Sequence, residues 1–300
     1  QSGLRAHSTG KRHGRTDEKR VRRKADDSDG KGWTYENFPV SYMLLRRQLR
    51  PKVHDFYDYA GMRVDISDCE SVPPQEKITR LDAMEEVLLG QRSAINRADA
   101  LSAARLRASL LQTHVPFETA TDLLVAFRND SRGHEYHTWN DLLEYCKYSA
   151  NPVGRYLICL HEENTAAFGP SDALCTSLQI LNHLQDCAKD LERLNRCYMP
   201  SEWMQRAGSS AQDLLAGRTS PAMRRVFNTL LDGVDDLNRQ ASALPAHIKD
   251  RRFRMECAAI VALAHRLTQR LRREDPLAGR VALRRTDAMH AAIAALRAWA

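Results

Sequence analysis

Four polar side chains follow one another at helical spacing in the second half of the chain. They are Gln179, Asn182, Asp186 and Asp190, at offsets of 0, 3, 7 and 11 residues. At about 100° per residue, these offsets predict one narrow stripe of an α-helix, about 16 Å long. Mg²⁺ takes one or two carboxylates and completes its shell with water and phosphate oxygens. The stripe therefore indicates chemistry on a phosphate group held through Mg²⁺.

A solvated helix face is the alternative interpretation, in which Asp186 and Asp190 only flank Lys189 and Arg193. The remaining positions of this segment are rather apolar, and carboxylates on an apolar helix are costly to bury without a partner. These apolar residues are Ile180, Leu181, Leu184 and Ala188. The aligned amides upstream also favour a binding stripe over a solvated face.

A second pair of carboxylates occurs early in the chain. Asp65 and Asp68 are spaced i and i+3, about 60° apart, on a predicted helix whose Val53, Phe56 and Ala60 can face a core. Alone, this pair is more typical of a solvated helix end than of a ligand pair.

Two further segments could contribute to a site. The run from Tyr145 to Arg155 contains small residues, which allow a neighbouring helix or a flat apolar ligand to approach the backbone. Arg196 follows the second carboxylate pair and places a guanidinium just beyond Asp190.

The elements that must position these residues are all helical. Alanine, leucine and arginine dominate after Trp33, and no stretch alternates at period two. We expect Pro73 to prevent the helix that ends at Asp68 from continuing, and Asn151-Pro152 to kink or locally unwind a long helix. The predicted helices cover 39–49, 51–68, 75–90, 97–113, 117–128, 139–163, 171–191, 200–215, 219–242, 246–273 and 284–298. The sequence thus predicts one all-α domain over residues 33–300, after a disordered basic tail over residues 1–32.

Charge and cysteine content narrow the function classes. The net charge is +7, of which residues 1–31 carry +5. Such a tail is typical of an incidental solvated segment, or of a segment that binds an anionic membrane surface or nucleic acid. We do not expect nucleic-acid binding, because no aromatic side chains accompany the basic residues. No apolar run of 18 residues occurs, and the seven cysteines show no metal-ligand spacing. We therefore expect reduced thiols, no zinc, and a cytoplasmic protein.

Four segments together resemble the squalene/phytoene synthase family of head-to-head prenyl transferases. They are Glu36–Val40, Tyr148–Arg155, Leu184–Asp190 and Asp275–Val281, in this order along residues 33–298. They are most similar to one subgroup, the bacterial hydroxysqualene synthases of hopanoid biosynthesis.

The resemblance implies an isoprenoid-synthase helical bundle around an apolar cavity, with two Asp-rich helices gripping a diphosphate through Mg²⁺. The implied substrate is presqualene diphosphate, or another lipid derived from farnesyl diphosphate. Ionisation gives a carbocation that water captures, forming hydroxysqualene. Because the product is apolar, the resemblance also implies peripheral contact with the inner membrane and, as partners, other enzymes of the hopanoid pathway.

The resemblance also implies roles for particular residues. Asp186 and Asp190 match the family's second Asp-rich motif, which binds Mg²⁺. Asp65 and Asp68 stand near the first Asp-rich motif. Tyr57 and Tyr145 match tyrosines of the reaction centre, although two packed core tyrosines are an equally simple interpretation. The residues expected to contact substrate are Asn37, Phe38, Arg63, Gln179, Asn182, Arg196 and Tyr198.

The first motif departs from the family pattern. The family has Asp-Asp-x-x-Asp with an arginine three positions earlier, whereas this chain has Val64 and Gly61 at the first aspartate and the arginine. Asp65 and Arg63 are each turned about 100° or more around the helix from those positions. Two alternatives to hydroxysqualene formation follow: a catalytically impaired member that acts as a binding or assembly protein, and condensation of two prenyl diphosphates of the phytoene or dehydrosqualene type.

Overall fold

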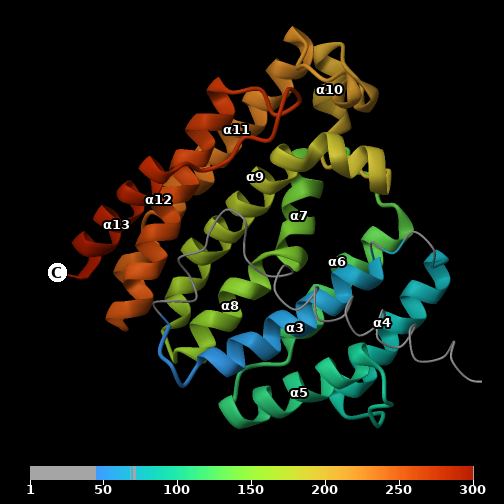
Figure 1. Ribbon diagram of the computed structural model, residues 1–300, viewed down its shortest axis with the longest axis vertical. Helices are drawn as coiled ribbons and strands as arrows, with labels where there is room; N and C mark the ends of the chain where they lie inside the picture. The colour runs from blue at the N-terminus through green and yellow to red at the C-terminus, as the bar shows by residue number, and fades with distance from the viewer. Residues whose placement is uncertain (1–44, 68, 70–71, 300) are drawn as a thin grey trace, which may run out of the picture. The chain divides into compact units, whose positions relative to one another are not determined.

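The computed structural model describes residues 45–67, 69 and 72–299, and within these residues the chain forms helices and no strand (Figure 1). The α-helices are α3 (Arg50–Ser67), α4 (Pro74–Leu89), α5 (Ala98–Thr113), α6 (Glu118–Arg132), α7 (Trp139–Ser149), α8 (Asn151–Leu160), α9 (Phe168–Leu194), α10 (Ser201–Ala207), α11 (Pro221–Ala241), α12 (Arg251–Arg273) and α13 (Arg285–Trp299). Three short 3₁₀ helices join them: η1 (Thr165–Ala167), η2 (Ala211–Leu215) and η3 (Leu244–His247). The predicted all-α fold is confirmed.

Proline, glycine and capping residues set most helix ends where the sequence indicates. The kink predicted at Asn151-Pro152 is instead a complete break, which divides the helix predicted over 139–163, because Ala150 leaves the helical region and separates α7 from α8. At its other end, α7 begins with a capping box in which Thr138 and Asp141 bond each other's backbone N–H groups.

Three further predicted helices differ from the structure. The described part of the segment predicted as 39–49 is a turn, and the helix starts at Arg50. The segment predicted as 200–215 is divided, because Gly208 ends α10 with a φ of 69°. The segment predicted as 246–273 begins instead at Arg251, where the Asp250 carboxylate accepts a hydrogen bond from the Phe253 N–H group.

The buried side chains form two apolar cores joined by α8. One core consists mainly of residues from α3, α4, α5 and α6, and the other of residues from α6, α7 and the later helices. Tyr156 and Leu160 of α8 belong to the first core and Ile158 to the second. Figure 1 shows α3 to α6 on one side of α8 and α9 to α13 on the other.

Gly154 allows α8 to lie close against α9. A Cβ atom at Gly154 would lie 2.3 Å from Ser171 Oγ and 2.7 Å from Cys175 Sγ, well inside van der Waals contact. Of the two alternatives for this small-residue run, the structure therefore places a neighbouring helix at the glycine. The contact fixes the long helix on which the stripe lies.

The helix α9 has 27 residues and packs against α7, α8, α11 and α12. At about 1.5 Å per residue it is about 40 Å long. It ends at Asn195, whose φ of 50° turns the chain away. The polar stripe therefore lies on a rigid element that is packed along most of its length.

Candidate active site

The four residues of the predicted stripe all lie on α9, and each is partly buried. The carboxylates of Asp186 and Asp190 are 29% and 20% exposed. Lys189 is on the exposed side of the same helix. The stripe is therefore not a solvated face, which answers the question that the sequence alone left open.

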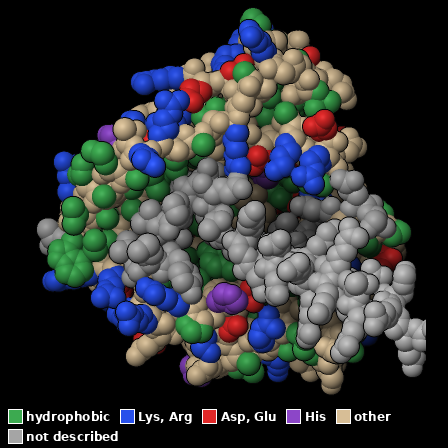
Figure 2. Space-filling model, viewed as in Figure 1, with side chains coloured by type: hydrophobic (Ala, Val, Ile, Leu, Met, Phe, Trp, Pro, Cys, Tyr) green, Lys and Arg blue, Asp and Glu red, His purple; other side chains and the backbone are tan. Residues whose placement is uncertain are grey.

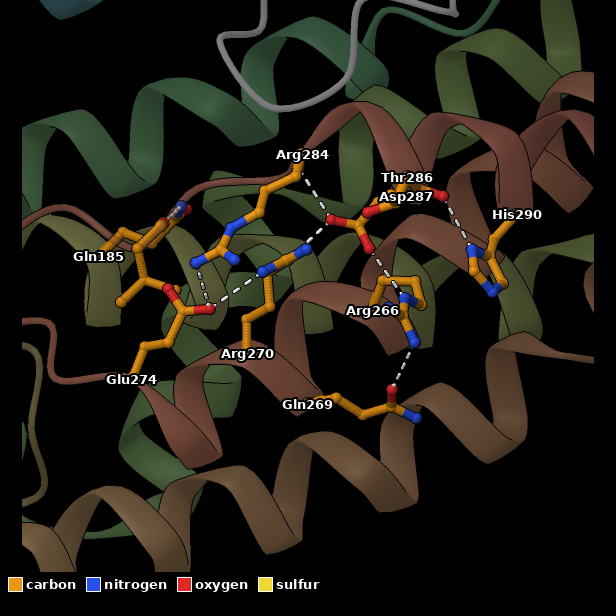
Figure 3. A network of polar contacts seen from close by, with 10 residues as sticks. Gln185, Arg266, Gln269, Arg270, Glu274, Arg284, Thr286, Asp287 and His290 are labelled. Carbon is orange, nitrogen blue, oxygen red and sulfur yellow. Dashed lines mark hydrogen bonds and ion pairs between the residues drawn. The ribbon is translucent and has the colours of Figure 1, made fainter.

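A cation from the segment between α12 and α13 lies beside the first carboxylate. Arg280 Nη2 is 3.9 Å from Asp186 Oδ2. The preceding residue on α9, Gln185, is buried and donates a hydrogen bond to the carbonyl oxygen of Val281. This bond holds the chain next to Arg280 against α9, close to the second Asp-rich motif (Gln185 in Figure 3).

The sequence interpretation missed His183, which lies inside the stripe. Its Nε2 atom is 3.0 Å from Gln179 Nε2, and its Nδ1 atom is 3.9 Å from Asp190 Oδ2. The signal was present in the sequence, because an offset of four residues from Gln179 places His183 at about 40°, beside Asp190. Its imidazole is buried, so a packed side chain lies beside the partly exposed Asp190 at the end of the stripe.

Tyr145 and Tyr198 adjoin this histidine, and Tyr136 packs against both tyrosines. The His183 ring stacks on Tyr198 with centroids 3.6 Å apart, and the Tyr198 ring lies 5.5 Å from those of Tyr136 and Tyr145. The Tyr145 hydroxyl donates a hydrogen bond to Asp130 Oδ2 at 3.1 Å. Tyr145 and Tyr198, both predicted site residues, are therefore brought together next to the Asp190 end of the stripe.

Burial keeps these phenols protonated. It raises the pKa of Tyr145, Tyr136 and Tyr198, and the negative charge of Asp130 raises each pKa further. The cluster thus offers neutral hydroxyl groups and ring faces at neutral pH. Asp130 and Tyr136 were missed by the sequence interpretation, because their partners come from other helices and no spacing pattern reveals them.

Arg196 connects the second Asp-rich motif to the end of the first. Its Nη2 atom donates a hydrogen bond to the carbonyl oxygen of Ser67, the last residue of α3, at 3.0 Å. Lys77 Nζ donates to the same oxygen at 2.8 Å. Two cations therefore gather at the C-terminal end of α3, where the helix dipole favours positive charge.

Several predicted site residues lie outside the described part of the chain. These are Asn37, Phe38 and Asp68, together with the side chains of Arg63 and Asp65. Tyr57 is described, and it packs against the first core, where its ring meets Phe56 edge-on. Tyr57 and Tyr145 thus contribute to different cores.

The donor set on α9 suits a hard cation. Asp186 and Asp190 are one turn apart, and both carboxylates are partly exposed. Carboxylate oxygens that keep access to water are the ligands Mg²⁺ takes, with water and phosphate completing the shell. Within the described residues, no three His, Cys, Asp or Glu side chains cluster closely enough to form a complete metal site. A second carboxylate-bearing element would have to join them.

Comparison with known proteins decides the family. The family model for squalene/phytoene synthase matches residues 34–287 of this chain. The chain belongs to the squalene/phytoene synthase family. It is a squalene/phytoene-type isoprenoid synthase by relationship, as the sequence motifs predicted.

Individual relatives of this squalene/phytoene synthase family member cover most of its length. Hydroxysqualene synthases from Sinorhizobium fredii and Rhodopseudomonas palustris are each 37% identical to it. These matches cover 83% and 89% of this chain and 83% and 90% of the relatives.

Solved structures of the squalene/phytoene synthase family share the fold. The crystal structure of squalene synthase HpnC from Alicyclobacillus acidocaldarius matches with a TM-score of 0.69 at 26% identity, over 86% of this chain and 94% of that one. A dehydrosqualene synthase in complex with a ligand matches with a TM-score of 0.65 at 18% identity, over 86% of both chains. The helical isoprenoid-synthase fold is thereby confirmed.

Two further predictions from the sequence concern the cysteines and membrane-spanning segments. All seven cysteines carry free thiols. In the described part of the chain, no helix combines the length and the apolarity that crossing a bilayer requires.

Proposed function

We propose that this protein ionises presqualene diphosphate and that water captures the carbocation, giving hydroxysqualene and diphosphate. The half-buried stripe of Gln179, Asn182, Asp186 and Asp190 carries this proposal. The similarity to hydroxysqualene synthases over most of the chain supports the choice of substrate.

The residues of α9 would bind the diphosphate end of the substrate. Asp186 and Asp190 would hold Mg²⁺ together with Asp65 and Asp68 from the first Asp-rich segment. When bound, Mg²⁺ supplies positive charge that stabilises the departing diphosphate. Both α9 carboxylates keep part of their surface exposed, so that a metal ion and its water ligands could reach their oxygens.

Arginine side chains would neutralise the phosphate oxygens that face away from the metal. Arg196 reaches the end of α3, and Arg280 lies beside Asp186. Guanidinium groups bind phosphate oxygens in pairs through their planar N–H donors. The two arginines come from different segments, Arg196 from the one that follows α9 and Arg280 from the one between α12 and α13.

The aromatic cluster would lie next to the developing cation. Ring faces attract a cation through their quadrupole, and the buried tyrosines Tyr145 and Tyr198 carry no competing negative charge. In the reaction, the carbon–oxygen bond to diphosphate breaks and diphosphate keeps the electron pair. A water oxygen then bonds to the carbocation and one proton is released, so that nothing is oxidised or reduced.

Product identification in H₂¹⁸O tests the proposal. We expect purified protein, incubated with presqualene diphosphate and Mg²⁺, to form hydroxysqualene that carries one ¹⁸O atom by mass spectrometry. A hydrocarbon product without oxygen would contradict water capture while keeping the ionisation step. Absence of any lipid product would contradict the catalytic proposal, and farnesyl diphosphate as a second substrate would reveal head-to-head condensation instead.

A further inference from the structure

A row of large apolar side chains is exposed along α13. Met289, Ile293, Leu296 and Trp299, here called the α13 face, are 64%, 47%, 67% and 47% exposed. Their spacing of four, three and three residues places them within about 120° of the helix circumference. Figure 2 shows hydrophobic side chains gathered over α13, at the position that Figure 1 gives this helix.

The opposite side of α13 carries small residues. Ala291 and Ala295 are buried where α13 packs on α12. This arrangement reverses the usual amphipathic helix of a globular protein, in which the large apolar side chains face the core. The exposed row therefore needs a reason beyond the packing of this domain.

Buried ion pairs fix the orientation of α13. The Asp287 carboxylate has no exposed surface and accepts hydrogen bonds from Arg266 Nε at 2.8 Å and Arg270 Nε at 2.7 Å, both on α12. It also accepts one from the N–H group of Arg284 at 2.8 Å (Figure 3). Removing one partner of such a buried network is costly. The apolar row thus points outward because the helix is held that way, and not because its end is frayed.

A basic pocket adjoins the C-terminal end of this row. Its cations are Arg46, Lys249, Arg251 and Arg252, which together with Asp250 and Trp299 line a cavity of about 400 Å³. The single carboxylate of this pocket is paired with Arg46. The guanidinium of Arg251 lies 5.5 Å over the ring of Trp299, so that the basic pocket and the α13 face are continuous.

We propose that the α13 face and the basic pocket dock on an anionic lipid surface. The apolar row would enter the boundary between headgroups and acyl chains, and the cations of the pocket other than Arg46, which pairs with Asp250, would meet headgroup phosphates. Helices that lie in a membrane interface combine such an apolar row with flanking Lys and Arg, and tryptophan is favoured where the apolar and charged regions meet. This inference does not depend on the reaction that the enzyme catalyses.

Flotation with lipid vesicles tests this inference on the full chain. We expect the protein to float with vesicles of phosphatidylcholine and phosphatidylglycerol in a 60:40 ratio, and only weakly with phosphatidylcholine alone. The double variant Ile293→Ser, Leu296→Ser should lower the partition coefficient by at least about tenfold. Arg251→Gln should lower it by roughly fivefold. Leu111→Ser is the matched control, because Leu111 is a comparably exposed leucine on α5, and it should float like the wild type.

Two results would overturn the inference. The first is equal flotation of the wild type and the double variant, since any lipid binding would then come from another part of the chain. The second is a wild type that ignores vesicles but sediments as a dimer, with the double variant sedimenting as a monomer. In that case the α13 face would be an interface between copies. Circular dichroism of each variant separates loss of binding from loss of folding.

Discussion

The guanidinium of Arg196 donates a hydrogen bond to the carbonyl oxygen of Ser67, at a distance of 3.0 Å. Arg196 follows the second Asp-rich motif, and Ser67 is the last residue of α3, the helix that carries Asp65 of the first Asp-rich motif. The two motifs are 121 residues apart when counted from Asp65 to Asp186. A single side chain thus ties together the two segments that would grip a diphosphate.

Arg196→Gln should weaken diphosphate binding. The substitution removes a charged donor at the end of α3 and a cation beside the proposed site, and charge-assisted hydrogen bonds are each worth about 1.5–3 kcal/mol. We expect the affinity for inorganic pyrophosphate in the presence of Mg²⁺, measured by calorimetry, to fall by about tenfold or more. Arg193→Gln, at the exposed C-terminal end of α9, is the control and should bind as the wild type does. Equal affinity in both variants would exclude Arg196 from the site.

Tyr145→Phe should cost stability as well as turnover. The variant keeps the ring but removes the hydrogen bond to the buried carboxylate of Asp130, and such a loss costs about 1–3 kcal/mol. We expect a lower free energy of unfolding in urea and a reduced kcat. Tyr148→Phe is the matched control, because Tyr148 is partly exposed and its ring lies under the ammonium of the exposed Lys147. If Tyr145→Phe is as stable as Tyr148→Phe, the hydrogen bond to Asp130 contributes nothing to the free energy of unfolding.

Much of this organisation could be predicted from sequence. The stripe on α9 was predictable because local spacing alone sets which residues share a helix face. A disturbance of the helix at Asn151-Pro152 was predictable because proline lacks the N–H group that a helix interior uses, although a kink was expected and the structure has a complete break. By contrast, the bond between Gln185 and Val281 and the approach of Arg280 to Asp186 depend on how distant helices pack. No local pattern carries that information, so these contacts appear only in the structure.

Restoring the first motif should raise turnover. Val64 and Gly61 stand where the family has an aspartate and an arginine. The double variant Val64→Asp, Gly61→Arg would therefore add one metal ligand and one cation to the proposed diphosphate-binding site. We expect kcat with presqualene diphosphate and Mg²⁺ to increase by about tenfold or more. The variant Val64→Asn, which has nearly the same shape as aspartate without its charge, should give no increase. Unchanged turnover in both variants would mean that the first motif takes no part in catalysis.

Glu256 should make the fold less stable as the pH rises. Its side chain is buried, neither carboxylate oxygen accepts a hydrogen bond within the described part of the chain, and burial raises its pKa to about 9. A carboxyl pKa that is raised in the folded state means that the folded protein holds a proton which the unfolded protein releases above about pH 4.5. Stability conferred by the protonated group is therefore lost progressively from about pH 4.5 towards pH 9.

Glu256→Gln tests this sign, because glutamine is neutral at every pH. The free energy of unfolding of the variant relative to the wild type should increase by on the order of 3 kcal/mol between about pH 4.5 and pH 7. Urea unfolding at several pH values measures the difference. The exposed Glu192→Gln is the control and should show a difference that stays flat with pH. A flat difference for Glu256→Gln as well would show that this carboxyl is solvated in the folded protein.

The most direct test of the central claim is the rate of pyrophosphate release from presqualene diphosphate, compared between the wild type, Asp186→Asn and Glu192→Gln. We predict Mg²⁺-dependent release by the wild type and by Glu192→Gln, and a loss of at least about a hundredfold in Asp186→Asn, because one carboxylate of the metal grip becomes a neutral amide. Equal release by all three proteins, or no release by the wild type, would contradict the claim that the α9 stripe binds and ionises a diphosphate.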